Sequence, residues 1–553
     1  MNKIVAENSL PGALPAEWDI PPAMWGDSTI EGFASQMSVN LGETVEFKVQ
    51  TKSAAYRIDI YRLGWYGGLG ARKVATVRPS VPLPQSQPSP SVDFSTGLIE
   101  CSGWEVSATW DVPIDHTSGI HLAKLVCEDR VGLHHIVFVV RDDVAASQVL
   151  VQTSDTTWQA YNTWGGASLY ENSLVPVLPR AHKVSYDRPF ATRSNESGAN
   201  YLFNAEYPLV RWLEANGFDV SYCTGVDTDL HGERLLDHPV FVSVGHDEYW
   251  SGDQRRHVEE ARDAGVHLVF LSGNEIYWRT RWEQGINTLS PHRTLVCYKE
   301  TIENARTDPS GEWTGTWRDP RFSTRGNGEQ PENALSGTWS RKVAGFSPSA
   351  IQVPADFSSH RFWRDTSIAT LAPGGIRTLT VGTLGYEYDE APLGVARPAG
   401  LAHLSSTVED VLCLQDYGSI FTIATATHSL TLYRHTSGAL VFSAGTVQWA
   451  WGLDAVHDVG GRVSGAADPD IRQATLNLLV DMGVQAETLQ LGLVAATAST
   501  DGTPPTSTIS IPLPGSVLKP GQTVEISGTA SDIDGRVAGV EISVNDGVTW
   551  RPA

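Results

Sequence analysis

The stretch from Pro239 to Trp278 limits the fold of this chain more than any other. Two apolar runs, Val240–Val244 and Val266–Leu271, flank a segment with a helical pattern, Gly252–Ala264. Strand, helix and strand in this length form the crossover that joins two parallel strands. Because parallel sheets are covered by helices on both faces, the stretch predicts an α/β domain.

Polar residues follow the predicted strands at the points where they end. His246 and Glu248 follow the first strand, Asn274 follows the second, and Tyr161 comes shortly after a third apolar run, Gln148–Thr153. Open α/β sheets bind ligands at the carboxyl ends of their strands, so we expect these side chains to converge. A phenolate and a carboxylate are hard oxygen ligands that suit ferric iron or a similar hard cation, while histidine and asparagine suit the orientation of water or a carbonyl group.

Simpler explanations exist for several of these residues. Tyr161 alone also suits a packed tyrosine, His246 suits a cap or a core position, and Glu387 lies in an acidic stretch that suits a solvated loop as well as a general base. Cys223 is followed by a polar loop and not by a tight elbow, and no GxSxG motif exists, so a nucleophilic hydrolase is disfavoured. The glycine-rich segment Gly64–Gly70 lacks the lysine of a phosphate loop and is interpreted as a hairpin.

The chain as a whole is predicted to be multidomain. We expect an N-terminal β-sandwich, a central α/β domain with a mostly parallel sheet of the glutamine-amidotransferase or flavodoxin-like type, and a partial C-terminal immunoglobulin-like β segment. The predicted boundaries are a lead segment 1–31, the sandwich 32–146, the α/β domain 147–494, a linker 495–505 and the immunoglobulin-like segment 506–553. Since the last strands make about half a sandwich, we expect the natural product to continue past Ala553.

Composition excludes several classes of function. The net charge of −23 argues against a nucleic-acid-binding surface, which needs clustered lysine and arginine. The five cysteines contain no C-x-x-C pair, so neither a zinc knuckle nor a dense disulfide framework is expected. The sequence has no visible signal peptide and no run of about 18 apolar residues, so no membrane span is expected and the compartment stays open.

Several motifs together resemble one family. They are Tyr61-Arg-Leu-Gly-Trp-Tyr-Gly-Gly68, Trp158-Gln-Ala-Tyr-Asn162, Val244-Gly-His-Asp-Glu-Tyr-Trp250, Leu271-Ser-Gly-Asn-Glu275, Leu384-Gly-Tyr-Glu387 and Ala444-Gly-Thr-Val-Gln-Trp449. With these motifs the chain, from about Gly32 to Leu491, resembles the large (β) subunit of N,N-dimethylformamidase and its bacterial relatives.

This resemblance implies a mononuclear ferric site with two tyrosines and one glutamate that hydrolyses a small amide. By motif, Tyr161 matches one tyrosine and Glu248 the glutamate, while His246, Asn274 and Glu387 match residues around the iron. The other tyrosine belongs to a motif like Ser-Gly-Val-Tyr, which here reads Ser118-Gly-Ile-His121. An imidazole is a competent iron ligand, so the resemblance places His121 of the sandwich at the metal and the site between two domains.

Two functions follow as hypotheses. The first is an iron-dependent hydrolase of a small amide, with His121, Tyr161 and Glu248 as ligands and with His246, Asn274 and Glu387 handling protons and the oxyanion. A small partner subunit and a homo-oligomer both stay open for it. The second is a non-catalytic secreted or surface binding protein that keeps the scaffold, which the immunoglobulin-like segment and the replacement of a tyrosine by His121 favour. A third possibility is that these side chains are simply packed and hydrogen-bonded without metal.

Overall fold

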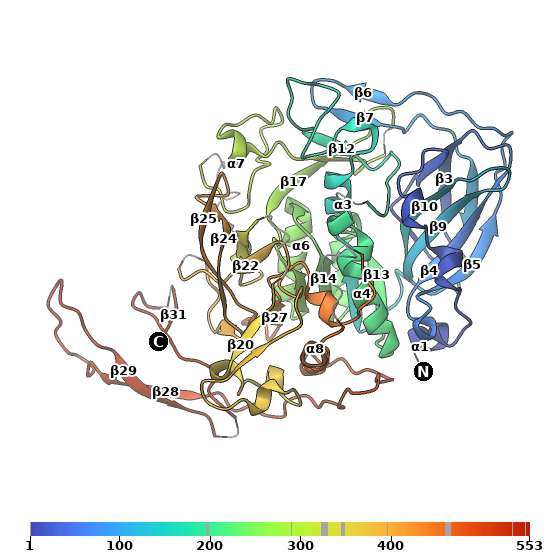
Figure 1. Ribbon diagram of the computed structural model, residues 1–553. Helices are drawn as coiled ribbons and strands as arrows, with labels where there is room; N and C mark the ends of the chain where they lie inside the picture. The colour runs from blue at the N-terminus through green and yellow to red at the C-terminus, as the bar shows by residue number, and fades with distance from the viewer. Residues whose placement is uncertain are drawn as a thin grey trace.

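The computed structural model describes residues 2–194, 198–288, 290–321, 330–343, 349–394, 396–458, 466–533, 535–547 and 549–553. A β-sandwich near the N-terminus stands beside a central unit built of sheets and helices, and a C-terminal β segment extends from the opposite side (Figure 1). No helix in the described ranges has the length and apolar character that a membrane crossing needs.

The sandwich consists of a three-stranded and a five-stranded sheet. The first sheet has the order β1 (Ile30–Ala34), β3 (Thr44–Thr51), β8 (Ala108–Asp111), and the second has the order β2 (Ser38–Asn40), β10 (Leu133–Arg141), β9 (Gly119–Cys127), β4 (Tyr56–Leu63), β5 (Ala71–Val77). Successive side chains of a strand point to opposite faces. In β9, Ile120 and Leu122 therefore pack into the core shared with the central unit, whereas Ala123 and Leu125 pack into the core inside the sandwich.

The central unit is organised around a seven-stranded sheet. Its strands, in spatial order, are β13 (Val220–Cys223), β11 (Val149–Gln152), β14 (Val240–Gly245), β16 (His267–Ser272), β27 (Leu440–Ser443), β26 (Thr431–Arg434) and β23 (Ala402–His403). The strands from β13 to β27 are paired in parallel, and β26 and β23 add two antiparallel pairings at one edge. A mostly parallel sheet is therefore present, while its likeness to the glutamine-amidotransferase or flavodoxin-like folds stays a prediction.

Helices cover both faces of this sheet. Val242 and Val244 of β14 belong to the apolar core that also holds the inward residues of α4 (Leu202–Ala215) and α8 (Pro469–Asp481). Phe241, which precedes Val242 and points to the opposite face of the sheet, packs in a second core with α6 (Gly252–Asp263). The crossover predicted from the sequence thus forms as β14, α6 and β16. Ser251 caps α6, since its hydroxyl accepts a hydrogen bond from the backbone N–H of Gln254.

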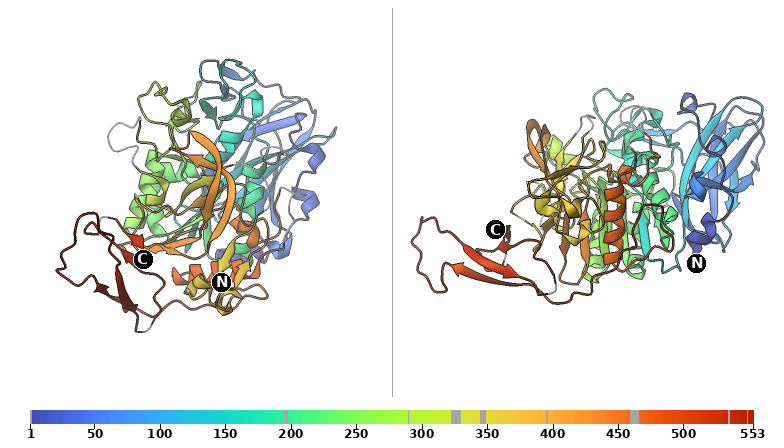
Figure 2. Two further views of the ribbon diagram at one scale, coloured as in Figure 1. Left: turned by 60° about the vertical axis from the view of Figure 1, so that its left-hand side comes forward. Right: turned by 60° about the horizontal axis from the view of Figure 1, so that its bottom comes forward.

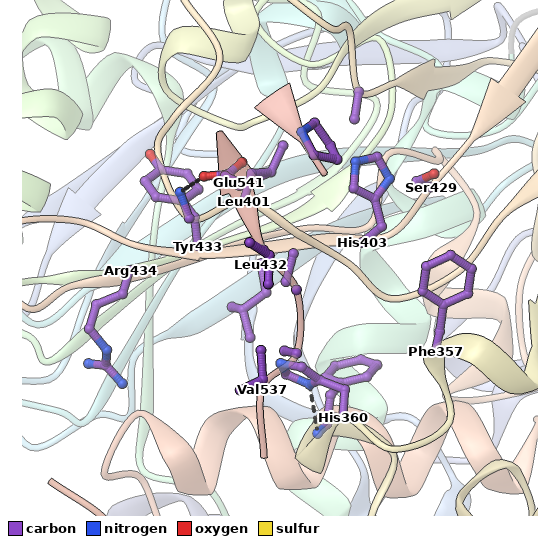
Figure 3. A pocket seen from close by; sticks show the side chains of 18 of the residues that line it. Phe357, His360, Leu401, His403, Ser429, Leu432, Tyr433, Arg434, Val537 and Glu541 are labelled. Atoms are coloured by element: carbon purple, nitrogen blue, oxygen red, sulfur yellow. Dashed lines mark hydrogen bonds between the residues drawn. The ribbon is translucent and has the colours of Figure 1, made fainter. Parts of the chain in front are cut away.

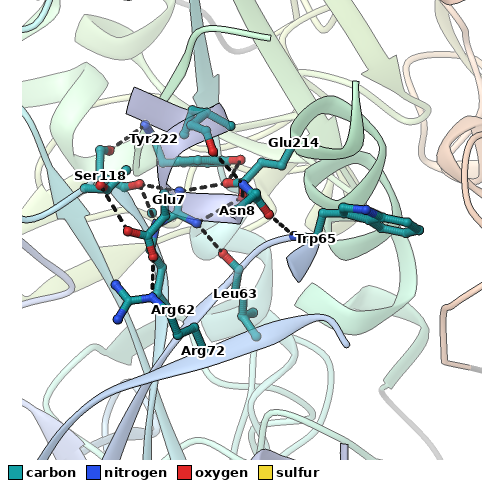
Figure 4. A network of polar contacts seen from close by, with 12 residues as sticks. Glu7, Asn8, Arg62, Leu63, Trp65, Arg72, Ser118, Glu214 and Tyr222 are labelled. Carbon is teal, nitrogen blue, oxygen red and sulfur yellow. Dashed lines mark hydrogen bonds and ion pairs between the residues drawn. The ribbon is translucent and has the colours of Figure 1, made fainter. Parts of the chain in front are cut away.

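A buried ion pair joins the sandwich to the central unit. Arg62 of β4 donates to both carboxylate oxygens of Glu214 in α4, at 2.8 and 2.9 Å, and to the carbonyl of Ser118 at 2.7 Å. Tyr222 and Asn8 also donate to Glu214, at 2.9 and 2.8 Å (Figure 4). Charge and hydrogen bonds are matched at this contact, so the sandwich is fixed against the helix that lies beside β14.

The remaining elements surround the central sheet or lie beyond it. A four-stranded sheet has the order β12 (Lys183–Ser185), β18 (Thr294–Val296), β17 (Trp278–Glu283), β15 (Tyr249–Ser251), and a small closed barrel has the order β19 (Trp339–Lys342), β22 (Tyr388–Glu390), β25 (Ile420–His428), β24 (Thr407–Gln415). At the C-terminal end, the hairpin of β28 (Thr506–Ile511) and β29 (Ser527–Ser531) projects away from the body (Figure 2).

Candidate functional site

The predicted strand ends meet because β11, β14 and β16 are direct neighbours in the sheet. The chain leaves β14 through Gly245, whose φ of +96° and close approach to Glu206 exclude a side chain. This turn carries the chain directly to His246 and Glu248. Helix α3 (Asp155–Tyr161) follows β11 and ends at Tyr161.

Two tyrosine hydroxyls meet the Glu248 carboxylate. Tyr170 Oη donates to Glu248 at 2.8 Å from Oε2 and 2.9 Å from Oε1, and Tyr161 Oη lies 3.4 Å from Oε2. The two tyrosine rings stack with centroids 4.1 Å apart. Three oxygen-bearing side chains therefore point at one place, which we call the Glu248 cluster.

Tyr170 is the member of the cluster that the sequence analysis missed. It lies nine positions after Tyr161 in a loop without regular periodicity, so no pattern in the sequence marks it. The residue is 41% exposed, yet its hydroxyl points inward to Glu248 and accepts a hydrogen bond from Tyr249 at 2.8 Å. Tyr170 thus lies between solvent and the cluster.

His246 connects Glu248 to a second carboxylate. Its Nε2 lies 2.8 Å from Glu387 Oε2 and 3.6 Å from Glu248 Oε2, and its Nδ1 lies 2.7 Å from Asn200 Oδ1. Since an amide oxygen only accepts, Nδ1 carries a proton and Nε2 faces a carboxylate oxygen. Two acceptors at 2.8 Å require a proton between them, so the His246–Glu387 pair holds one that can be donated.

Asn274 holds Glu387 in place from the other side. Its Nδ2 donates to Glu387 Oε2 at 2.7 Å, and its backbone N–H donates to Asp389 at 2.7 Å. Left-handed backbone conformations gather at this edge, at Asn274 (φ +54°), Ile276 (φ +55°) and Lys299 (φ +51°). Such conformations are costly for residues other than glycine and are concentrated at functional sites.

Lys299 brings a positive charge to the cluster. It is 1% exposed, and its Nζ lies 3.3 Å from the centroid of the Tyr170 ring and 4.9 Å from that of Trp278. A cation over an aromatic face is attracted by the ring quadrupole. Burial lowers the pKa of Lys299 to about 8, although the Glu248 carboxylate acts in the opposite direction.

The electrostatics of the cluster favour neutral tyrosines when no cation is bound. Burial and the Glu248 carboxylate raise the pKa of Tyr161 and of Tyr170 well above the ordinary value. Burial also raises the pKa of Glu248, against the pull of His246. Burial acts to lower the pKa of His246, but Glu387 and Glu248 raise it on balance. Negative charge is therefore crowded here, and a bound cation would relieve it.

His121 does not join the Glu248 cluster, and its assignment as a metal ligand is corrected. It has the same parity in β9 as Ala123 and Leu125, so it faces the interior of the sandwich. Its Nε2 pairs with His116 at 2.9 Å, its Nδ1 with the carbonyl of Gly119 at 2.9 Å, and its ring stacks on Phe138. Both ring nitrogens are thus engaged away from the strand ends.

The other residues predicted for the site do lie together. Tyr161, Glu248, His246, Asn274 and Glu387 form one connected set of contacts. Within the described ranges no group of three or more His, Cys, Asp or Glu side chains has the arrangement of a metal site. A metal at the cluster would therefore need the tyrosine oxygens as donors. The five cysteines are buried and unpaired.

A large cavity lies elsewhere. It has a volume of about 1380 Å³ and lies between the β23–β26 edge and the C-terminal segment, where Arg397 and Glu541 form an ion pair. Its lining includes His360, His403 and Val537 (Figure 3), and no side chain of the Glu248 cluster is part of it. Cavity size therefore does not locate the strand-end site; the convergence of polar groups does.

Comparison with known proteins identifies the family. Residues 57–462 match the family described as N,N-dimethylformamidase beta subunit-like, C-terminal. The chain belongs to this family. The matched residues include every member of the Glu248 cluster, so the resemblance predicted from the motifs is confirmed. Residues 505–551 match a bacterial Ig domain, which confirms the immunoglobulin-like character of the C-terminal segment.

Individual relatives are distant. The N,N-dimethylformamidase beta subunit of Paracoccus aminophilus is 26% identical over 225 residues, which make up 38% of this chain and 28% of that protein. The subunit of the same name from an Alcaligenes species gives the same identity and coverage. The match thus spans less than a third of the length of these relatives. A crystal structure of an uncharacterized Bacillus anthracis protein covers 20% of this chain and 84% of its own, with 11% identity and a TM-score of 0.13, which carries no argument.

Proposed function

We propose that this protein hydrolyses a small amide at the Glu248 cluster, with iron held by Tyr161, Tyr170 and Glu248. One observation carries the proposal: two tyrosine hydroxyls reach the same carboxylate, at 2.8 and 3.4 Å from Glu248 Oε2, beside a His–Glu pair that holds a proton. The relatives are named as beta subunits of an amide-cleaving enzyme, which is consistent with this chemistry.

The residues present fit a hard trivalent cation. Tyrosinate and carboxylate oxygens are the donors that such an ion prefers, and all three side chains carry negative charge once the tyrosines are deprotonated. The pKa values of both tyrosines are raised in the protein without a bound cation. A metal bound to an ionisable side chain favours the deprotonated form of that side chain, so a bound cation would lower these pKa values. Bound there, the ion would polarise the amide carbonyl and lower the pKa of water.

The protein supplies the proton transfers itself. Cleavage of an amide produces an amine, a poor leaving group unless its nitrogen receives a proton. His246 Nε2 and Glu387 Oε2 share a proton at 2.8 Å, and Asn274 fixes the Glu387 carboxylate with its Nδ2 at 2.7 Å. The pair is placed to accept a proton from the attacking water and to return one to the leaving nitrogen. Lys299 holds a positive charge over the Tyr170 ring, where it would help to stabilise negative charge that develops on the carbonyl oxygen.

A partner subunit is part of the proposal, since the curated relatives are beta subunits by name. One of the two observations that favoured a non-catalytic binding protein no longer does so. That hypothesis rested partly on the absence of a second tyrosine at His121, and Tyr170 offers that second phenol instead. The C-terminal Ig domain remains in its favour, because such modules also occur in binding proteins.

Metal content and turnover together test the proposal. Protein produced with added iron should contain about one iron per chain by elemental analysis and should release amine from small formamides and acetamides. Protein stripped with a chelator should lose turnover and regain it when iron is restored. A preparation that binds no iron after supplementation would rule out the mechanism, and iron binding without turnover of any small amide would favour the binding-protein alternative.

A further inference from the structure

The segment from Tyr161 to Tyr170, which we call the tyrosine loop, carries both tyrosines of the Glu248 cluster. Helix α3 ends at Tyr161, and before Tyr170 the backbone forms only one short turn of 3-10 helix, Trp164–Gly166. One backbone hydrogen bond, from Leu169 to the carbonyl of Ala160 at 3.0 Å, joins the two ends of the loop. Regular structure therefore does little to set the distance between the two phenols.

A single buried guanidinium fastens this loop. Arg188, which follows β12 in the chain, is 1% exposed and donates four hydrogen bonds to backbone carbonyls. Each terminal nitrogen of an arginine carries two hydrogens, so both nitrogens are fully used. The acceptors lie at the end of α3 and in the loop itself: Gln159 at 3.2 Å, Asn162 at 2.8 Å, Trp164 at 3.2 Å and Ala167 at 2.9 Å.

The charge of Arg188 is not what the fold gains from this residue. None of its acceptors among the described residues is a carboxylate, and burial lowers the pKa of Arg188 to about 10, which leaves it protonated at neutral pH. Burial of a charge without a counter-ion costs free energy, and an apolar side chain could fill the same space without that cost. The attachment of four carbonyls by one planar fork is therefore what the guanidinium adds.

We propose that Arg188 is a positioning residue of the site, and that its four hydrogen bonds hold Tyr170 in the Glu248 cluster. The inference rests on the proposed function, in which the phenols of Tyr161 and Tyr170 bind iron. The two rings stack with centroids 4.1 Å apart, and the Tyr170 hydroxyl lies 2.8 Å from Glu248 Oε2. Lys299 contacts the ring of Tyr170 and so does not set the path of the backbone. Arg188 does, because its acceptors lie on both sides of Tyr161 and three residues before Tyr170.

Hydrogen–deuterium exchange of the metal-free protein tests the attachment. Arg188→Lys keeps the charge, but an ammonium group has three hydrogens at one point and cannot span four carbonyls. Arg188→Met keeps much of the volume and removes every donor. In both variants the backbone amides of the tyrosine loop should exchange about tenfold or more faster than in the native protein, because several hydrogen bonds are lost. Loop exchange as slow as in the native protein in a folded variant would overturn the inference.

The visible spectrum of the iron-loaded protein tests whether Arg188 acts through Tyr170. A tyrosinate bound to ferric iron gives an absorption band, which should weaken and shift in Arg188→Lys as expected for Tyr170→Phe. The double variant should match Tyr170→Phe, since a residue that only places Tyr170 has no further effect once the phenol oxygen is gone. Additive changes in the double variant would overturn the inference.

Arg255 provides the matched control. It is also 1% exposed and donates to the backbone carbonyls of Gln330 and Pro331, as well as to Glu259, but it fastens a different loop. Arg255→Met should keep the native band and the native exchange of the tyrosine loop. A band altered as much as in Arg188→Lys would show a general loss of stability and overturn the inference.

The inference and the proposed function fail in different ways. A native protein that binds no iron would sink the proposed function, and the exchange of the tyrosine loop would then decide the inference alone. A native protein that binds iron, with an unchanged loop and band in Arg188→Lys, would overturn the inference and leave the proposed function intact.

Discussion

The Arg62–Glu214 contact and the Glu248 cluster are both buried and charged, but only the first is balanced. Arg62 is fully buried, and its guanidinium donates to the two oxygens of Glu214 and to backbone carbonyls. At the strand ends, Glu248 and Glu387 crowd around His246, the tyrosine pKa values are raised, and no described residue donates a hydrogen bond to Asn274 Oδ1. A region whose polar groups satisfy one another holds the fold, and a region that leaves charge unmatched is prepared for a ligand.

The largest expected effect on stability comes from breaking the balanced contact. Arg62→Met leaves Glu214 buried without its counter-charge, which should lower the free energy of unfolding by about 3–5 kcal/mol. Urea denaturation measures it. The double variant Arg62→Met with Glu214→Met should recover much of the loss, since no charge then stays buried. A single variant as stable as the native protein would show that the contact is not balanced in the way described.

Removal of a charge at the Glu248 cluster should have little effect on stability and a large effect on amide turnover. Glu248→Gln removes one of the crowded negative charges, so the free energy of unfolding of the metal-free protein should change by less than about 1 kcal/mol or increase. Amide turnover should fall by about a thousandfold or more, as for the loss of a principal catalytic group. Parallel denaturation and kinetic assays measure the two quantities. Strong destabilisation with residual turnover would assign Glu248 a structural role instead.

A smaller effect on stability, which depends on pH, is expected from Glu206, a buried acid that belongs neither to the Arg62–Glu214 contact nor to the Glu248 cluster. Burial raises the pKa of Glu206 from 4.5 to about 7, although Trp158 donates to it at 2.8 Å. The raised pKa means that Glu206 contributes stability below pH 4.5, and that this contribution is lost as the pH rises through about 7.

Glu206→Gln stays neutral at every pH, so its free energy of unfolding should fall less than that of the native protein between pH 4.5 and 7. Urea titrations at several pH values give the slope directly. Identical slopes for the two proteins would show that Glu206 does not titrate in this range.

The sequence predicted the sheet better than it predicted the site. The crossover from Val240 to Leu271 was predicted almost residue for residue, because apolar runs and a helical segment are local patterns. Convergence of Tyr161, His246, Glu248 and Asn274 followed from the rule that parallel strands end at one edge. Glu387 joined them through its motif and the resemblance.

The positions of Tyr170 and Lys299 at the cluster could not be predicted from the sequence, for a physical reason. Both lie in loops, where no periodicity records which way a side chain points, and each reaches the cluster only through tertiary packing. His121 was misplaced because a motif match ignores the pleat. Its parity with Ala123 and Leu125 places it inside the sandwich, one position out of phase with Ile120 and Leu122, which face the central unit.

The visible spectrum of the iron-loaded protein tests the central claim most directly. A tyrosinate bound to ferric iron gives an absorption band, and we assign the bound tyrosinates to Tyr161 and Tyr170. The band should weaken and shift in Tyr170→Phe, while His121→Gln, checked for native folding by circular dichroism, should keep it unchanged. An unchanged band in Tyr170→Phe together with an altered band in His121→Gln would contradict the account and return the second ligand to the sandwich.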